Sequence, residues 1–420
     1  MFRTITAITT GVLLAARIGC AETAAPPLQL ADVIAEARQR NPQIQSARQR
    51  STASAAVPAQ VSAYDDPMVT YEAWNSPDWF NSPDNNIVKL SQKVPFPGKR
   101  TLAGNIAEGT AEMARRDAQS VELDVIAMVR RAYYDLWMSH ENRLIYARDQ
   151  ELVQRFARIA EAKYTVGQVS QPDVLRAQVE VTRLINRVTT ATLAIESARA
   201  ELNALLSRPP EEPLGIPEEP QRLRLAESPE ALVRTALAQR PELAAQAAVI
   251  KGDEAGVRLA RLNYFPDFEF TGERFFNSGQ RDGLGAIVSL SIPFVHASKY
   301  AAAGDEANAR LAAAQADLRQ LQDRIRREVQ QAYLRARAAL EQHELFVTTH
   351  IPQAEQALQA TEIGYQTGKV DFLSLIDSVR AIESVHIEHI QAAADFEKAF
   401  ADLERAVGAD LPRTDAAAGE

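Results

Sequence analysis

The sequence contains a single cysteine, Cys20, among its 420 residues, so no disulfide can form within one chain. It also contains no basic tract. Lysine and arginine are scattered, and the formal charge is −9 at pH 7, which argues against a nucleic-acid partner because such a partner needs a positively charged surface. Gly-rich phosphate loops, Gly-x-Ser-x-Gly elbows and His-Glu-x-x-His runs are absent as well. We therefore expect no catalytic centre and no bound cofactor.

Long apolar runs are missing too. The N-terminal stretch 5–16 is apolar except for Thr and Gly, but it is shorter than the roughly 18 residues that a membrane helix needs. It follows Arg3 and precedes small residues, which is typical of a secretory signal peptide, here residues 1–21. Cys20 in the cleavage region is a candidate for lipidation. Arg17 stands where a lipoprotein signal has an aliphatic residue, so we favour cleavage that removes the cysteine.

The chain contains an internal repeat, which has to be recognised before the fold can be interpreted. Five landmarks recur in the same order at offsets of 198 to 201 residues: Pro42 and Pro241, Pro67 and Pro266, Pro95 and Pro293, Gly167 and Gly368, Leu202 and Leu403. We assign residues 22–206 to the first repeat and 229–410 to the second. The Pro- and Glu-rich residues 207–228 are predicted to form a linker, and 411–420 a disordered tail.

Each repeat is predicted to consist of a helix, a strand pair and a long helical hairpin. Residues 110–166 and 305–351 contain no Gly or Pro, which favours hairpins over about 98–206 and 296–408. At 1.5 Å per residue, the first of these uninterrupted segments would extend roughly 85 Å as a helix, more than a compact domain can contain. The helices alone fit a plain antiparallel coiled coil equally well.

Two short β-hairpins are predicted, at about 67–95 and 266–293. Apolar and polar residues alternate along them, with Val69 and Tyr71 on one face and Thr70 and Glu72 on the other. Strands of 9 to 11 residues have the length of a tilted strand that crosses a membrane within a barrel. Because four strands cannot close a barrel, several copies of the chain would have to contribute. Five aromatic residues beside polar loops are predicted to lie at the membrane interface: Trp74, Trp79, Phe80, Phe275 and Phe276. The alternative is a pair of soluble hairpins with one buried face.

These motifs together resemble the TolC-type outer-membrane factors, and within them the cobalt-zinc-cadmium and copper-silver efflux branch. The resemblance covers residues 28–410. It rests on the duplicated Asn-Pro and Arg-Pro helices, on KVPFPGKR at 93–100, and on the turns YTVGQVSQPDVLRAQ and YQTGKVDFLSLIDSVR. The turns are shared by the whole family, whereas the Pro-Phe-Pro-Gly-Lys run indicates the metal branch.

The resemblance implies a fold that is mainly α with a small β part. Duplicated long α-hairpins from three chains would form a trimeric helical barrel, and four strands per chain would contribute to a 12-stranded transmembrane β-barrel. It further implies a homotrimer in the lipid of the outer membrane that extends into the periplasm. Its expected partners are a periplasmic adaptor and an inner-membrane RND-type pump. The protein is then a passive conduit and not an enzyme.

In the family, the two helical turns form the periplasmic tip, which contacts the adaptor and is closed at rest. Tyr164 and Gly167 begin the first turn here, and Tyr365 and Gly368 begin the second; Tyr365 is also a candidate gate residue. Each Gly is expected to end its helix in the left-handed conformation. The resemblance places Asp173, six residues after the first Gly, in a bond across the closed tip.

The resemblance also implies that carboxylates six and nine residues after the second Gly surround the pore. Asp377 fills the last of these places, but Ser374 stands in the first. The family's Arg two residues after this Gly is Val370, so Lys369 or Asp371 would have to supply substitute charges. We hypothesise that three Asp377 side chains narrow the entrance and select for cations.

Three alternatives remain from the sequence. The conduit exports heavy-metal cations, or it is a drug-efflux or type I secretion channel on the same scaffold, because no pore residue specifies the cargo. In the third, the chain is a soluble periplasmic coiled-coil adaptor or scaffold. His386 and His389 have helical spacing that suits a metal ion, but we interpret them as part of a solvated helix face.

Overall fold

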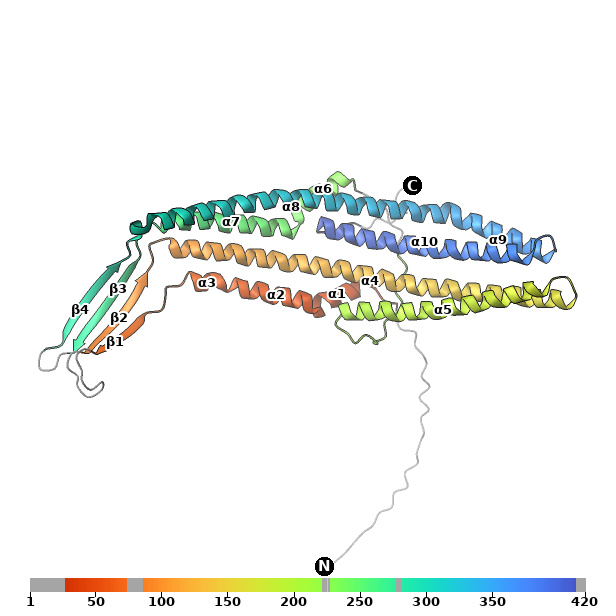
Figure 1. The fold of residues 1–420 in the computed structure, drawn as a ribbon, viewed down its shortest axis with the longest axis horizontal. Coiled ribbons are helices and arrows are strands. Elements are labelled where there is room, and N and C mark those ends of the chain that lie inside the picture. Colours follow the sequence, from red (N-terminus) through yellow and green to blue (C-terminus); the bar gives the residue numbers. More distant parts are fainter. Residues whose placement is uncertain (1–26, 74–85, 221–224, 226, 277–280, 413–420) are drawn as a thin grey trace, which may run out of the picture.

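The structure is a computed structural model, and it describes residues 27–73, 86–220, 225, 227–276 and 281–412. The molecule is strongly elongated, with four strands at one end and two helical turns at the other (Figure 1). The predicted signal peptide with Cys20, most of the predicted tail, and Trp74, Trp79 and Phe80 lie outside the described residues. No helix in the described part of the chain is both long and apolar enough to cross a membrane.

The chain is mainly helical with one small antiparallel sheet, which confirms the predicted fold class. The first half contains α1 (Leu30–Arg40), α2 (Pro42–Ala55), α3 (Val57–Val61), β1 (Met68–Ala73), β2 (Asn86–Val94), α4 (Lys99–Thr165) and α5 (Gln171–Leu205). The second half contains α6 (Pro229–Gln239), α7 (Pro241–Leu262), β3 (Phe268–Phe276), β4 (Gly283–Leu290), the 3₁₀-helix η1 (Pro293–His296), α8 (Ala297–Leu345), the π-helix η2 (Phe346–His350), α9 (Ile351–Gln366) and α10 (Phe372–Val407).

Proline divides the first helix of each half, where the sequence predicted one continuous helix. Pro42 and Pro241 are the first residues of α2 and α7, and the residues before them are extended, with ψ of 122° at Asn41 and 125° at Arg240. The proline ring disfavours helical backbone at the preceding residue and suits the first helical position. The Asn41 side chain accepts hydrogen bonds from the backbone N–H groups of residues 43 and 44, which caps α2.

The long helices set the length of the molecule. With 67 residues, α4 is about 100 Å long, and it packs against helices of both halves. The corresponding run of the second half is helical from residue 297 to 366 but contains the π-helical turn η2 directly before Pro352. Because proline has no N–H and its ring clashes with the carbonyl four residues earlier, a widened turn accommodates it within a continuing helix.

The four strands form a single antiparallel sheet in the order β1-β2-β3-β4, so the central β2–β3 pair joins the two halves. The register of the sheet confirms the prediction of which strand residues share a face. Val69 pairs with Leu90, and Tyr71 with Val88; all four side chains are exposed, forming an apolar face that continues onto β4. On the opposite face, Lys89 Nζ forms an ion pair with Glu72 Oε1 at 2.7 Å, and the Ser91 and Thr271 hydroxyl oxygens lie 2.9 Å apart.

The KVPFPGKR segment joins the sheet to the helices. Lys99 Nζ donates hydrogen bonds to Asp267 Oδ1 at 2.8 Å and to the Phe265 carbonyl at 2.9 Å. The ring of Phe96 stacks on the ring of Phe265, with their centres 4.7 Å apart. The backbone N–H of Phe96 donates to the same Asp267 oxygen. Gly98 precedes α4 with φ of +94°, a conformation that favours glycine. The motif therefore connects the strand-to-helix junction of the first half (β2 to α4) to the helix-to-strand junction of the second half (α7 to β3).

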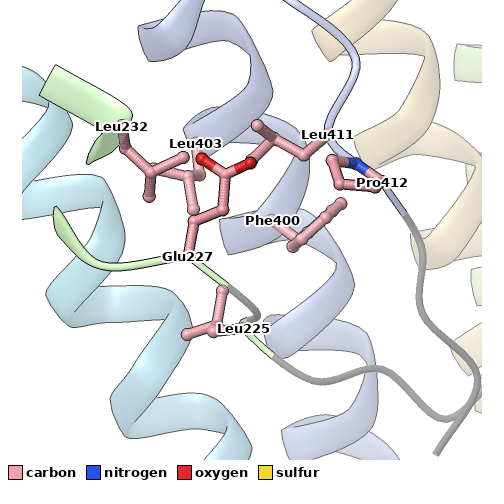
Figure 2. Close-up of a pocket in the computed structure, with 7 residues that line it drawn as sticks. All are labelled: Leu225, Glu227, Leu232, Phe400, Leu403, Leu411 and Pro412. Atoms are coloured by element: carbon pink, nitrogen blue, oxygen red, sulfur yellow. The ribbon is translucent and has the colours of Figure 1, made fainter. Parts of the chain in front are cut away.

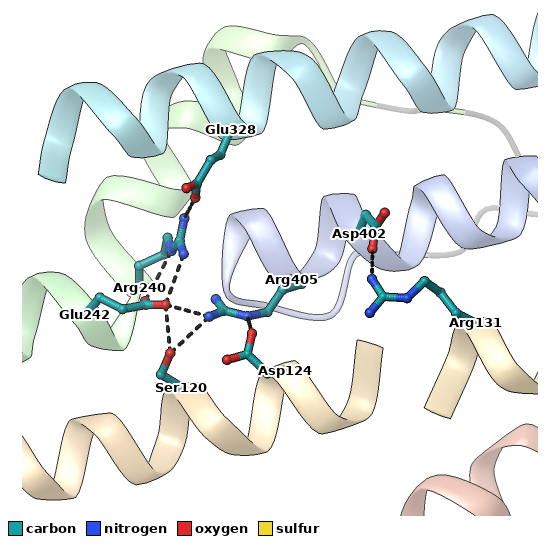
Figure 3. Close-up of polar contacts among 8 residues, drawn as sticks. All are labelled: Ser120, Asp124, Arg131, Arg240, Glu242, Glu328, Asp402 and Arg405. Carbon is teal, nitrogen blue, oxygen red and sulfur yellow. Dashed lines mark hydrogen bonds and ion pairs between the residues drawn. The ribbon is translucent and has the colours of Figure 1, made fainter. Parts of the chain in front are cut away.

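A network of charged side chains links the halves near the middle of the molecule (Figure 3). Arg405 of α10 pairs with Asp124 of α4, and its Nη2 donates to Glu242 Oε1 of α7 at 2.7 Å. Arg240 also donates to Glu242 and reaches Glu328 of α8 at 2.6 Å. Burial alone would raise the pKa of Glu242, but the hydrogen bonds and charges of Arg240 and Arg405 outweigh it and lower the pKa to about 2.

The linker is held against the helices at its middle and at its C-terminal end. The hydroxyl of Tyr133 on α4 donates to the Leu28 carbonyl at 2.7 Å and accepts from the Glu218 N–H at 2.9 Å. At the far end, linker residues and α6 meet α10 and the residues after it. There they line a shallow pocket (Figure 2), formed by Leu225, Glu227, Leu232, Phe400, Leu403, Leu411 and Pro412.

Candidate functional site

The candidate site is the helical tip, formed by the α4–α5 turn and the α9–α10 turn. Gly167 and Gly368 have φ of +74° and +77°, as predicted for residues that end a helix in the left-handed region. In the first turn, the N–H of Gln168 donates to the Lys163 carbonyl at 2.9 Å. In the second, the N–H of Lys369 donates to the Gly364 carbonyl at 2.8 Å. Both turns thus satisfy carbonyls at the end of the preceding helix.

Asp173 acts within its own turn in the single chain. Its Oδ2 accepts hydrogen bonds from the Ser170 hydroxyl at 2.9 Å and from the Ser170 N–H at 3.3 Å, and its Oδ1 lies 3.4 Å from Arg176. A carboxylate in the first turn of a helix is also stabilised by the helix dipole. A bond from Asp173 to a second copy of the chain remains a prediction.

The second turn places its polar residues differently. Asp371 caps α10, because its Oδ1 accepts from the Ser374 N–H at 3.0 Å, and hydrogen bonds from Ser374 lower the pKa of Asp371. Lys369 is exposed. The Asp377 side chain is 61% exposed, 3.7 Å from Arg380. Asp371 and Ser374 are thus explained by helix capping, whereas Asp377 is exposed, and its role in a pore remains a prediction.

The two tyrosines of the turns are not equivalent. Tyr164 is exposed, whereas Tyr365 is buried and contacts Phe372 edge-on at 5.5 Å. Tyr365 belongs to an apolar cluster between the two hairpins that includes Phe156 and Leu375. Burial, with a contribution from the Asp173 charge, raises the pKa of Tyr365, and its hydroxyl has no hydrogen-bond partner within the described residues.

Lys163 connects the two turns, and sequence reasoning missed it. Its Nζ donates to the Tyr365 carbonyl at 2.6 Å and to the Gln366 carbonyl at 3.3 Å, at the end of α9. The same ammonium lies 4.5 Å from the centre of the Tyr365 ring. The only sequence signal was a cation in the last turn of a helix, which is common and does not reveal a partner about 200 residues away.

Farther from the tip turns along the hairpins, an ion-pair ladder formed by Glu180, Arg183, Arg380 and Glu383 connects α5 with α10. Arg380 Nη2 donates to Glu180 Oε2 at 2.7 Å, and Arg183 pairs with Glu383 at 2.5 Å and with Glu180 at 2.7 Å. The Glu180 side chain is only 1% exposed. Burial would raise the pKa of Glu180, but hydrogen bonds from Arg380 and Arg183 outweigh it, so the pKa is lowered.

A further carboxylate, Asp149 of α4, lies near Glu383 and Arg183 of these ion pairs, and its recorded cation partner is its chain neighbour Arg148. Its side chain is 2% exposed, the nearest cation is Arg148 at 3.8 Å, and Oδ2 has no hydrogen-bond partner in the described chain. Burial raises the pKa of Asp149 to about 6; Arg148 opposes the shift and the Glu383 charge adds to it.

His386 and His389 contact neighbouring helices and do not lie on a free helix face, contrary to the expectation from the sequence. His389 stacks on His343 of α8 at 4.8 Å, and His386 Nδ1 lies 2.7 Å from Arg148 Nη2. Burial, together with the nearby His343 and His386, lowers the pKa of His389 to about 4. Within the described residues, no three His, Cys, Asp or Glu side chains are grouped so as to hold a metal ion.

An elongated chain with this sheet and two long hairpins is the fold of outer-membrane channels. The fold matches the outer-membrane channel OprN over 91% of this chain and 90% of that one, with a TM-score of 0.77 at 20% identity. It matches CusC over 93% and 94%, with a TM-score of 0.79 at 16% identity. VceC of Vibrio cholerae matches over 90% and 96%, with a TM-score of 0.76 at 16% identity.

The sequence leads to the same class. The pattern of the family described as outer membrane efflux protein matches residues 33–208 and again residues 232–409. The chain therefore belongs to the outer membrane efflux protein family. It is also 24% identical over 347 residues to the cobalt-zinc-cadmium resistance protein CzcC of Cupriavidus metallidurans, covering 79% of each chain.

Proposed function

We propose that the protein is the outer-membrane channel of a tripartite efflux system that exports heavy-metal cations. It would act as a homotrimer together with a periplasmic adaptor and an inner-membrane RND-type pump. The cargo assignment rests on the similarity to a cobalt-zinc-cadmium resistance protein over 79% of both chains. The KVPFPGKR junction, which in this structure connects the two halves through Lys99 and Asp267, is in keeping with the metal branch.

The sheet supports insertion in the outer membrane. One face presents exposed apolar side chains along all four strands, among them Tyr71, Leu90, Phe270 and Val288. The other face is more polar and carries Lys89, Thr271 and Glu273, together with the apolar residues Met68, Ile87, Phe275 and Ile287. Three such sheets, closed edge to edge, would give the 12-stranded barrel, with the apolar face toward lipid and the polar face toward the lumen. A closed barrel also pairs the outer edges of β1 and β4, which are the two edge strands of the sheet.

The cargo is tested in a deletion strain of the native host. We expect lower minimal inhibitory concentrations of zinc, cobalt, cadmium or copper, restored by the intact gene, and unchanged sensitivity to dyes and detergents. Sensitivity to dyes alone would instead support the drug-efflux alternative. Fractionation tests the location: a heat-modifiable oligomer in the outer-membrane fraction is expected, and a detergent-free soluble monomer would support the adaptor alternative.

The pore role of Asp377 is tested by electrophysiology. In the proposed pore, three Asp377 side chains would narrow the entrance and attract cations. Asp377→Ala is therefore expected to raise single-channel conductance or to weaken block by multivalent cations. Asp317→Ala serves as the control, because Asp317 is an exposed aspartate of α8 far from the tip. Equal conductance and block for both variants would remove Asp377 from the proposed pore.

A further inference from the structure

A polar contact between the two tip turns comes from Lys163 in the last turn of α4. Its half-buried side chain crosses from the first hairpin to the second and places Nζ 2.6 Å from the Tyr365 carbonyl and 3.3 Å from the Gln366 carbonyl. Both carbonyls belong to the last turn of α9. The contact therefore joins the C-terminal end of one long hairpin arm to that of the other.

The chemistry of this position favours a cation. The last carbonyls of a helix lack intrahelical partners, and their aligned dipoles give that end a partial negative charge. Two such ends, those of α4 and α9, lie at the tip; Lys163 belongs to the last turn of α4, and its ammonium donates to the last carbonyls of α9. Its hydrogen bonds carry a full positive charge, which makes them stronger than neutral ones. The face of the Tyr365 ring, 4.5 Å away, adds a cation–π contact.

The other polar side chains of the turns do not replace this link. The Asp173 carboxylate is used by Ser170 and Arg176 in its own turn. The Asp371 carboxylate caps its own helix. The next ion pairs between the hairpins start at Glu180 and Arg183, which are roughly 14 and 18 Å along α5 from its first residue, Gln171, at 1.5 Å per residue.

We propose that Lys163 sets the resting separation of the two tip turns within one protomer, and that loss of its contacts with the end of α9 allows the tip to widen. This rests on the proposed function, in which the tip is the narrow entrance of the channel. Tyr365 contributes its backbone carbonyl and its ring to the contact with Lys163. Its hydroxyl takes no part in the link.

Three variants of the full-length protein test this in planar bilayers. Lys163→Met keeps most of the apolar stem and removes the charge and the donors, and should raise the mean conductance at least threefold. Lys163→Arg retains a cation and should stay close to the wild type. Lys251→Met is the matched control, because Lys251 is an exposed lysine of α7, outside the two tip turns. Unchanged conductance of Lys163→Met, or an equal rise in Lys251→Met, would overturn the proposal.

A second measurement covers failure of the methionine variant to assemble. Lys163→Cys can be purified and treated with 2-bromoethylamine, which restores an ammonium of nearly the same length on a thioether stem. Conductance should be high before and low after treatment, with treated wild type as the control; no change on treatment would overturn the link. A wild-type protein that forms no channel at all would refute the proposed function instead, and the inference would fall with it.

Discussion

The buried carboxylate of Asp149 permits a quantitative test. In the folded chain the pKa is about 6, against an ordinary value of 3.8, so the folded state binds this proton more tightly than the unfolded state. Its contribution to stability therefore falls as the pH rises from about 4 to about 6, and the whole penalty remains above that range. At about 1.36 kcal/mol per pKa unit, the penalty at neutral pH is about 3 kcal/mol.

Asp149→Asn removes the buried charge and keeps the shape of the side chain. The amide loses the attraction to Arg148, which is 3.8 Å away, so we expect a net gain of about 1–2 kcal/mol at pH 7.5 and almost none near pH 4. For a chain of this size the gain corresponds to an apparent melting temperature roughly 1–2 °C higher.

The assay is thermal unfolding of the detergent-solubilised protein, followed by circular dichroism at 222 nm between pH 4 and 8. Glu151→Gln is the control, since Glu151 is an exposed carboxylate of the same helix. Its melting profile should follow that of the wild type. The reasoning is refuted if Asp149→Asn melts below the wild type at pH 7.5, or if the difference between the two is the same at pH 4 and pH 7.5.

Two further predictions concern packing and the linker. Gly109→Ala places a methyl carbon 2.7 Å from the Ala248 carbonyl oxygen, so α4 and α7 must separate; we expect a loss of about 1–3 kcal/mol and a lower melting temperature. Gly256→Ala, with open space around the new methyl, should not lower it. Tyr133→Phe removes both hydrogen bonds of that hydroxyl at a cost of about 1–3 kcal/mol, and should speed protease cleavage within the 207–228 linker.

The sequence predicted the features that depend on local pattern. Long segments without Gly or Pro gave the long helices, alternation gave the strand faces, and the positions of Gly167 and Gly368 gave the turns, because each depends on residues close together in the chain. The π-helical turn before Pro352 was not predicted. A proline within a helical pattern is compatible with a break, a kink or a widened turn, and packing decides among them.

The residues of the site were harder to predict, because the decisive contacts join positions about 200 residues apart. Lys163 and Asp149 are ordinary helix residues in the sequence. Only the packing of α4 against the second hairpin brings Lys163 to the Tyr365 carbonyl and buries Asp149 with its nearest cation 3.8 Å away. Tyr365 was predicted as a gate residue from its place in the turn. Its burial and the isolation of its hydroxyl depend on how Phe372 and the apolar cluster fill the space between the hairpins.

The ladder between α5 and α10 has a consequence for how copies of the chain recognise each other. On α5 the acid Glu180 precedes the base Arg183, whereas on α10 the base Arg380 precedes the acid Glu383, at nearly the same distance from their turns. Two α5 helices placed side by side would oppose acid to acid and base to base, and so would two α10 helices. The duplicated hairpins thus pair with each other and disfavour pairing with their own kind. Around the proposed ring, these four charges favour strict alternation of first and second hairpins.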